Sequence, residues 1–79
     1  MTFDELEKEF LKQFRSLAAR TSDKLNCVVY IDLGLWNQEL RAACHEHGAW
    51  RIEEDTLFGC EFYIVHSTPH GIKVYHKGA

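Results

Sequence analysis

The spacing of apolar residues changes along the chain, from steps of three and four residues near the start to steps of two near the end. The first pattern places apolar side chains on one side of a helix, whereas the second places them on one face of a β-strand. Between them lies a short, continuously apolar run, CVVYI at residues 27–31. Together these signals predict an α+β fold with helices packed on a sheet.

The chain begins with a predicted amphipathic helix. Thr2 and Glu5 have the spacing of a capping box, in which each side chain bonds the backbone N–H of the other residue. Acidic residues precede basic ones, which suits the helix dipole. The polar stretch at residues 19–26 is expected to end the helix. The apolar stripe consists of Phe3, Leu6, Phe10, Leu11, Phe14, Leu17 and Ala18.

The run at residues 27–31 contains three β-branched residues and no charged one. It therefore predicts a central strand that is covered on both faces. A second helix is expected at residues 34–47, with Asp32 as its N-cap and Gly48 at its end. The apolar side of this helix carries Trp36, Leu40, Ala43, Cys44 and His47.

Three further strands are predicted at residues 49–54, 57–66 and 71–77, because apolar residues occupy the even positions in each. The stretch STPHG between the last two strands is typical of a turn. A hairpin of these two strands would place three pairs opposite each other: Val65–Lys73, Tyr63–Tyr75 and Glu61–Lys77. An aromatic pair and an opposite-charge pair favour this antiparallel register.

The predicted order is thus α-β-α-β-β-β in a single small domain that spans residues 1–79. We expect two layers, with a mostly antiparallel four-stranded sheet and both helices on one of its faces. A chain this short buries only about 60–65% of the surface that its unfolded form exposes. Because a second copy could complete so thin a core, a homodimer is one of the expectations.

Charge and cysteine usage narrow the classes of function. The net charge of −3, from 9 basic and 12 acidic residues, disfavours general binding to nucleic acid. The 3 cysteines are irregularly spaced and predict no disulfide framework. The acidic start lacks an apolar signal-peptide core, and no apolar run approaches the ~20 residues of a membrane span. We expect a reduced, cytoplasmic protein without a membrane partner.

The stretch ACHEHGAW at residues 43–50 suggests a metal site, because it contains Cys44 and His47 at a spacing that shares one helix face. Zinc needs four ligands, or three and a water. A minority hypothesis is therefore a small zinc-binding protein that adds Cys60 and His66 from the sheet. The main expectation is no metal and no other cofactor, with Cys44 in the core and His47 in the last helical turn.

Catalytic motifs are not apparent in the sequence. His66 begins a single H-x-[ST] element, whereas two-histidine phosphoester chemistry needs a second such element to supply both acid and base. Cys44 lies near the C-terminal end of its predicted helix, where the dipole disfavours a thiolate. We expect a protein that is not an enzyme.

The odd positions of the predicted strands form a surface rich in tyrosine and basic residues. Tyrosine and arginine are enriched where proteins bind each other, so the surface predicts a protein partner. The alternative is a nucleic-acid-binding module that stacks bases on the tyrosines beside the lysines. The candidate residues are Tyr63, Tyr75, Arg51, Lys73 and Lys77.

A second candidate surface is the acidic turn at Glu53, Glu54 and Asp55, which could dock on a basic, nucleic-acid-binding surface of a partner. We therefore expect a small binding protein that occupies a surface of a larger partner. In size and acidic character the chain resembles phage and mobile-element inhibitors of host defence, including anti-CRISPR proteins. This resemblance implies an inhibitor of a host-defence or nucleic-acid-handling complex and assigns no residue.

Overall fold

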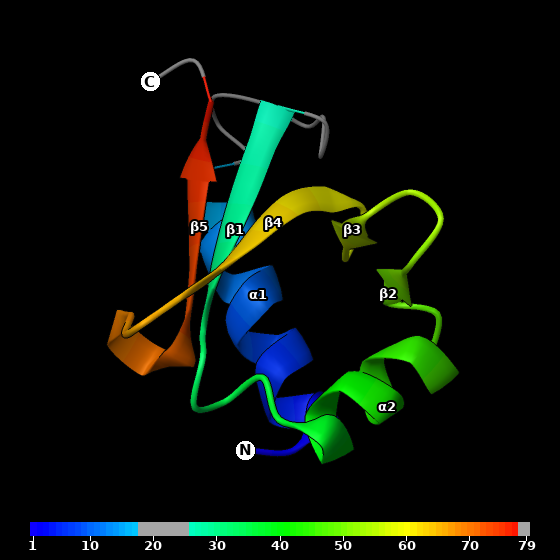
Figure 1. The fold of residues 1–79 in the computed structure, drawn as a ribbon. Helices are drawn as coiled ribbons and strands as arrows, with labels where there is room; N and C mark the ends of the chain where they lie inside the picture. The colour runs from blue at the N-terminus through cyan, green and yellow to red at the C-terminus, as the bar shows by residue number, and fades with distance from the viewer. Residues whose placement is uncertain (18–25, 78–79) are drawn as a thin grey trace.

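The computed structural model describes residues 1–17 and 26–77. It has two α-helices and one five-stranded sheet with the strand order β2-β3-β4-β1-β5 (Figure 1). The predicted α+β class is confirmed, but the predicted four-stranded, mostly antiparallel sheet is wrong, because the sheet is mixed and has five strands. The elements are α1 (Phe3–Leu17), β1 (Cys27–Asp32), α2 (Gln38–Glu46), β2 (Trp50–Arg51), β3 (Thr56–Leu57), β4 (Cys60–Val65), the 3-10 helix η2 (Pro69–Gly71) and β5 (Ile72–His76).

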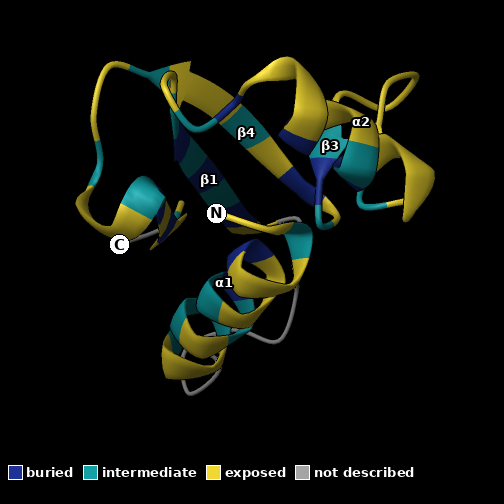
Figure 2. Cartoon of the chain, turned by 90° about the horizontal axis from the view of Figure 1, so that it is seen from below, coloured by how far each residue is buried: buried dark blue, intermediate teal, exposed yellow. Residues whose placement is uncertain are grey.

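Helix α1 begins at the predicted capping box. The Thr2 N–H donates to Glu5 Oε1 at 3.0 Å, and the Glu5 N–H donates to Thr2 Oγ1 at 3.2 Å. Leu6 and Phe10 are buried on the side facing the sheet, and the opposite side of the helix is exposed (Figure 2). Ala18 and all but the last residue of the predicted closing stretch 19–26 lie outside the described residues.

Strand β1 is internal in the sheet, as predicted. It pairs in parallel with β4 and antiparallel with β5, so β1 separates the two strands that were predicted to form a hairpin. The predicted hairpin is therefore wrong. The chain passes from β1 through α2 and the short strands β2 and β3 before it reaches β4, and this connection is long enough for a parallel crossover.

The predicted coverage of β1 on both faces is also wrong. Cys27, Val29 and Ile31 are buried, whereas Val28 and Tyr30 on the other face are only partly covered. Burial thus alternates along the strand, which shows that only one face of the sheet lies against the helices.

The predicted strand 57–66 is broken by a turn at Phe58 and Gly59. Both residues have positive φ, at 54° and 82°, as a two-residue hairpin turn requires. The turn separates β3 from β4. The predicted strand 49–54 shrinks to β2, and Ile52 lies in the following loop with 56% of its surface exposed.

Helix α2 begins later than predicted, and a different residue caps it. The Leu40 N–H donates to Asn37 Oδ1 at 2.9 Å, so Asn37 is the N-cap. Asp32 instead holds the turn that follows β1, where its Oδ1 accepts the Gly34 N–H at 2.7 Å. An aspartate at a strand end can either cap a helix or hold a turn. Here residues 33–36 form a turn before the helix begins, so Asp32 holds the turn.

The C-terminal end of α2 is close to the predicted one. Gly48 has φ 75°, and its N–H donates to the His45 carbonyl at 3.1 Å. The Ala49 N–H donates to the Cys44 carbonyl at 2.8 Å. These two bonds form a Schellman motif, which turns the chain from α2 toward β2.

The two helices lie against different parts of the sheet. Helix α1 packs against β5, whereas α2 packs against β2 and the start of α1 (Figure 1). Ile64, near the end of β4, was predicted to face the helices but is 47% exposed. None of the helices described in residues 1–17 and 26–77 is long and apolar enough to cross a membrane.

A single core joins the helices to the inner face of the sheet. Phe10 stacks on Phe58 with ring centroids 4.6 Å apart, so the turn before β4 also contributes to the core. The buried members are Leu6, Phe10, Cys27, Val29, Ile31, Trp36, Leu40, Cys44, Leu57, Cys60, Ile72 and Val74.

Candidate partner-binding surface

The outer face of the sheet is the face that points away from this core. The strand registers place Tyr63, Tyr30 and Lys73 in one row across β4, β1 and β5. The next row contains Glu61, Val28 and Tyr75. The outer face thus brings residues from three strands, far apart in the chain, into one surface.

Three tyrosines, Tyr30, Tyr63 and Tyr75, form what we call the tyrosine cluster. The ring of Tyr30 lies between the other two, with centroid distances of 5.9 Å to Tyr63 and 5.3 Å to Tyr75. Tyr63 and Tyr75 were predicted to face each other directly, and this is wrong because β1 lies between their strands. Both remain on the same face and are 49% and 45% exposed, so the cluster offers aromatic surface to a partner.

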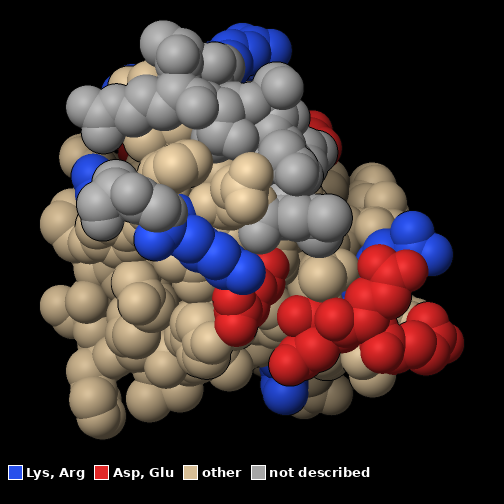
Figure 3. Space-filling view, turned by 90° about the horizontal axis from the view of Figure 1, so that it is seen from above, with Lys and Arg blue, Asp and Glu red and all other residues tan. Residues whose placement is uncertain are grey.

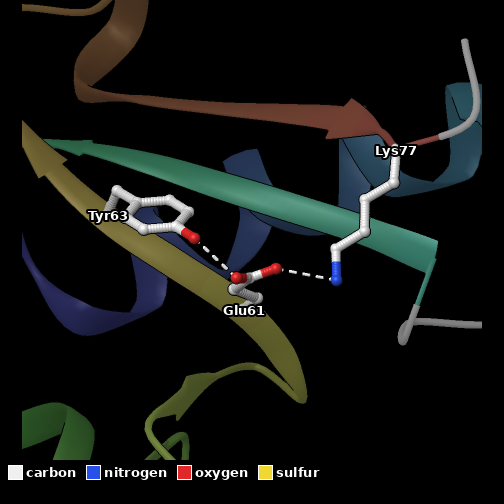
Figure 4. Close-up of polar contacts among 3 residues, drawn as sticks. All are labelled: Glu61, Tyr63 and Lys77. Carbon is white, nitrogen blue, oxygen red and sulfur yellow. Dashed lines mark hydrogen bonds and ion pairs between the residues drawn. The ribbon is translucent and has the colours of Figure 1, made fainter.

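A polar network crosses the outer face beside the cluster (Figure 4). Glu61 accepts a hydrogen bond from the Tyr63 hydroxyl at 2.5 Å and pairs with the Lys77 ammonium at 2.7 Å. The bond from Lys77, and then that from Tyr63, lowers the pKa of Glu61 below its ordinary range. The bond to the same carboxylate raises the pKa of Tyr63. The network therefore fixes the direction of the Tyr63 side chain.

A shallow pocket of about 210 Å³ lies at the other end of the outer face. Lys73 places its ammonium 5.8 Å from the centre of the Tyr75 ring, in range of a cation–π interaction. Ser67 and Thr68 of the turn after β4 also line the pocket, and Thr68 belongs to the single H-x-[ST] element that begins at His66. The pocket is lined by Tyr30, Val65, Ser67, Thr68, Pro69, Lys73 and Tyr75.

The acidic turn lies at the tip of the β2–β3 hairpin, where all three of its residues are exposed. Figure 3 shows acidic side chains gathered on one side of the molecule, with lysine or arginine side chains beside them. Arg51 pairs with Glu54 at 3.5 Å. Arg51 therefore belongs to the acidic turn, while Lys73 and Lys77 lie with the tyrosine cluster.

The residues of the zinc hypothesis are not brought together. Cys44 and Cys60 are fully buried, whereas His47 and His66 are exposed. His47 stacks on the ring of Phe3 with centroids 4.3 Å apart. Within the part of the chain that the structure describes, no three His, Cys, Asp or Glu side chains are placed to hold a metal ion.

The three cysteines are buried in the core. Burial raises the pKa of the Cys44 thiol to about 11, so this thiol is neutral at physiological pH. A neutral, inaccessible thiol is a poor nucleophile and a poor metal ligand. The geometry therefore gives Cys44 a packing role.

Comparison of the chain with protein-family models, with curated proteins and with solved structures found no match.

Proposed function

We propose that the chain is a small non-enzymatic protein that binds a partner protein through the outer face of its sheet. One observation supports this most directly: Tyr63 and Tyr75 are about half exposed, and Glu61 directs the hydroxyl of Tyr63. Exposed aromatic side chains that lose little conformational freedom on binding supply much of the affinity of protein interfaces. Tyr63 and Tyr75 are therefore the anchors of the proposed interface.

The charges on the outer face favour a protein over a nucleic acid. Lys77 is paired with Glu61 on this face, and Arg51 lies away from it, paired with Glu54 in the acidic turn. Binding to a phosphate backbone requires several basic side chains that are available to neutralise it. Lys73 beside the pocket is the basic group best placed to bind an anion. One such group carries too little charge to bind a phosphate backbone.

The acidic turn extends the proposal to a second contact. Its exposed carboxylates at Glu53, Glu54 and Asp55 fit a basic surface on the partner. A partner that handles nucleic acid offers such a surface, and occupying it would block the nucleic acid. We therefore propose an inhibitor of a host-defence or nucleic-acid-handling complex that acts in the cytoplasm.

The test is affinity capture from the native cell with three forms of the chain. The wild type and a Glu7→Ala/Lys8→Ala control, changed on the exposed side of α1, should retain the same partner. The Tyr63→Ala/Tyr75→Ala variant should lose it while keeping its circular dichroism spectrum. Retention of the partner by the tyrosine variant would overturn the placement of the interface.

The nucleic-acid alternative has its own test. A single-stranded RNA or DNA probe, incubated with the chain at about 50 mM salt, should show no shift in a gel, because phosphate contacts are strong in this range. A shift that disappears with rising salt and with Lys73→Ala would replace the protein partner by a nucleic acid.

A further inference from the structure

Strand β4 is longer than β3, its neighbour on one side, so part of β4 has no partner among the described strands on that side. Its first two residues, Cys60 and Glu61, pair with β3. On its other side, β4 pairs with β1 along its length to Val65. The segment from Phe62 to Val65 is therefore paired along one edge, and no described strand pairs with its second edge.

The backbone groups at this second edge belong to Phe62 and Ile64. The Leu33 N–H donates to the Val65 carbonyl at 2.7 Å, which shows that the polar groups of Val65 point toward β1. In a parallel ladder, alternate residues point to the same side, so Tyr63 does as well. Phe62 and Ile64 point away from β1, and no backbone hydrogen bond to them is found on this side among the described residues.

The chain before β3 leaves this edge because of a local turn. Asp55 has φ 55°, and its N–H donates to the Ile52 carbonyl at 3.2 Å inside the β2–β3 loop. A β3 strand one residue longer would have placed Asp55 opposite Phe62. The turn instead directs the chain away from β4 and leaves the edge open.

The side chains along this edge are uncharged and partly exposed. Tyr63 is 49% exposed on the outer face, and Ile64 is 47% exposed on the inner face. Proteins usually protect such an edge with charge, proline or a covering segment. At the opposite edge of the sheet, the Gln13 side chain of α1 covers β5 by bonding the Ile72 carbonyl and the Val74 N–H.

We propose that a second copy of the chain adds its own β4 to this edge, antiparallel, to form a two-fold dimer with one continuous sheet. The edge is self-complementary, since a two-fold axis brings identical N–H and C=O groups into register. No charged side chain lies in residues 62–65, so the pairing brings no like charges together. The apolar composition and the open backbone thus fit the same strand of another copy.

One register keeps the second copy clear of β3. When Ile64 pairs with Ile64 of the second copy, Phe62 pairs with His66, the residue that follows the strand, and Glu61, which pairs with β3, is not reached. Tyr63 then lies opposite Val65 of the second copy. This arrangement covers both Ile64 side chains and joins the two outer faces into one surface, so the dimer presents both tyrosine clusters side by side.

The test is sedimentation velocity over a range of concentrations, from micromolar to millimolar. The wild type should reach twice the 9.2-kDa mass of the chain. Ile64→Pro removes an N–H that points away from β1, so it should remain folded but monomeric. Ile64→Val keeps the N–H and the β-branched shape and should still dimerise. A wild type that stays monomeric, or a dimer that persists in Ile64→Pro, would overturn the proposal.

Hydrogen exchange in the wild type provides a readout that does not depend on a variant folding. The amides of Phe62 and Ile64 should exchange quickly in dilute protein and become protected at high concentration. The amides of Tyr63 and Val65, which face β1, should be protected at both. If Phe62 and Ile64 become protected only when a different protein is added, the occupant of the edge is that protein and the dimer is wrong.

Discussion

Glu61 and Lys77 form an ion pair of 2.7 Å across the outer face, although the strand that carries Glu61 does not pair with the segment that carries Lys77. The two side chains reach over β1 and meet above it (Figure 4). Both are about half exposed, so the pair alone adds little to stability. Its effect is to direct the Glu61 carboxylate, which in turn accepts the bond from Tyr63.

The pKa shifts in this network predict a pH dependence. The lowered pKa of Glu61 means that its contribution to stability is present above its unfolded value, about 4.3, and is lost as pH falls through the folded value. The raised pKa of Tyr63 means that its contribution is present below about 10 and is lost as pH rises through the folded value. The network is therefore intact around neutral pH.

Glu61→Gln should lower the pKa of Tyr63 toward the ordinary tyrosine value, because the charged acceptor is gone. An NMR titration of the labelled tyrosine rings measures this. Glu7→Gln on α1 makes the same change in net charge and should leave Tyr63 unaffected. An unchanged Tyr63 titration in Glu61→Gln would show that the hydrogen bond does not form.

The same ion pair shows what the sequence could predict about the fold. Alternation correctly placed Glu61, Tyr63, Tyr75 and Lys77 on one face, because this depends only on strand period. The neighbours of the strands were not predictable in this way. Two strands with matching faces give the same side-chain agreement whether they are adjacent or separated by a third strand, and β1 provides that third strand.

We expect Gln13 of α1 to stabilise the fold through its bonds to the edge strand β5. Its side-chain amide donates to the Ile72 carbonyl at 2.8 Å, and its oxygen accepts the Val74 N–H at 2.8 Å. Gln13→Leu should lower the free energy of unfolding by about 1–3 kcal/mol, since both backbone groups lose their partner. Urea unfolding measures this, with Lys12→Ala on the exposed side as the control. Equal stability of Gln13→Leu and wild type would contradict the role of Gln13.

Replacement of Thr56 should stabilise the fold. Its Oγ1 is buried and has no hydrogen-bond partner in the described part of the chain. Thr56→Val keeps the β-branched shape that suits β3 and removes the unpaired hydroxyl, so it should raise the free energy of unfolding by about 1 kcal/mol. The neighbouring exposed substitution Glu53→Gln should change it little. Lower stability of Thr56→Val would indicate that the hydroxyl is bonded in solution.

We expect the cysteine thiols to react slowly with disulfide reagents while the protein is folded. Cys27, Cys44 and Cys60 have no exposed surface, and burial raises the pKa of Cys44 to about 11. A disulfide reagent such as Ellman's should react with all 3 thiols only after denaturation. Rapid reaction of the native protein at neutral pH would show that the core opens, and it would reopen the question of a reactive thiol.

The candidate surface was partly predictable for the same physical reason as the fold. Tyr63, Tyr75, Lys73 and Lys77 share the predicted face, whereas Arg51 turns to the acidic loop because the β2–β3 hairpin places Glu54 beside it. The central place of Tyr30 depends on strand order, which periodicity does not encode. Ser67 and Thr68 line the pocket with residues of β1 and β5, a neighbourhood that strand period alone does not predict.

The most direct test of the proposed interface is the affinity of the purified partner, measured by calorimetry, for the wild type and for Tyr75→Ala and Tyr63→Ala separately. Each substitution should weaken binding by at least about thirtyfold, as expected for an aromatic anchor worth 2 kcal/mol or more. The Glu7→Ala/Lys8→Ala control should bind like the wild type. Wild-type affinity in both tyrosine variants would contradict the account, because the partner would then bind elsewhere.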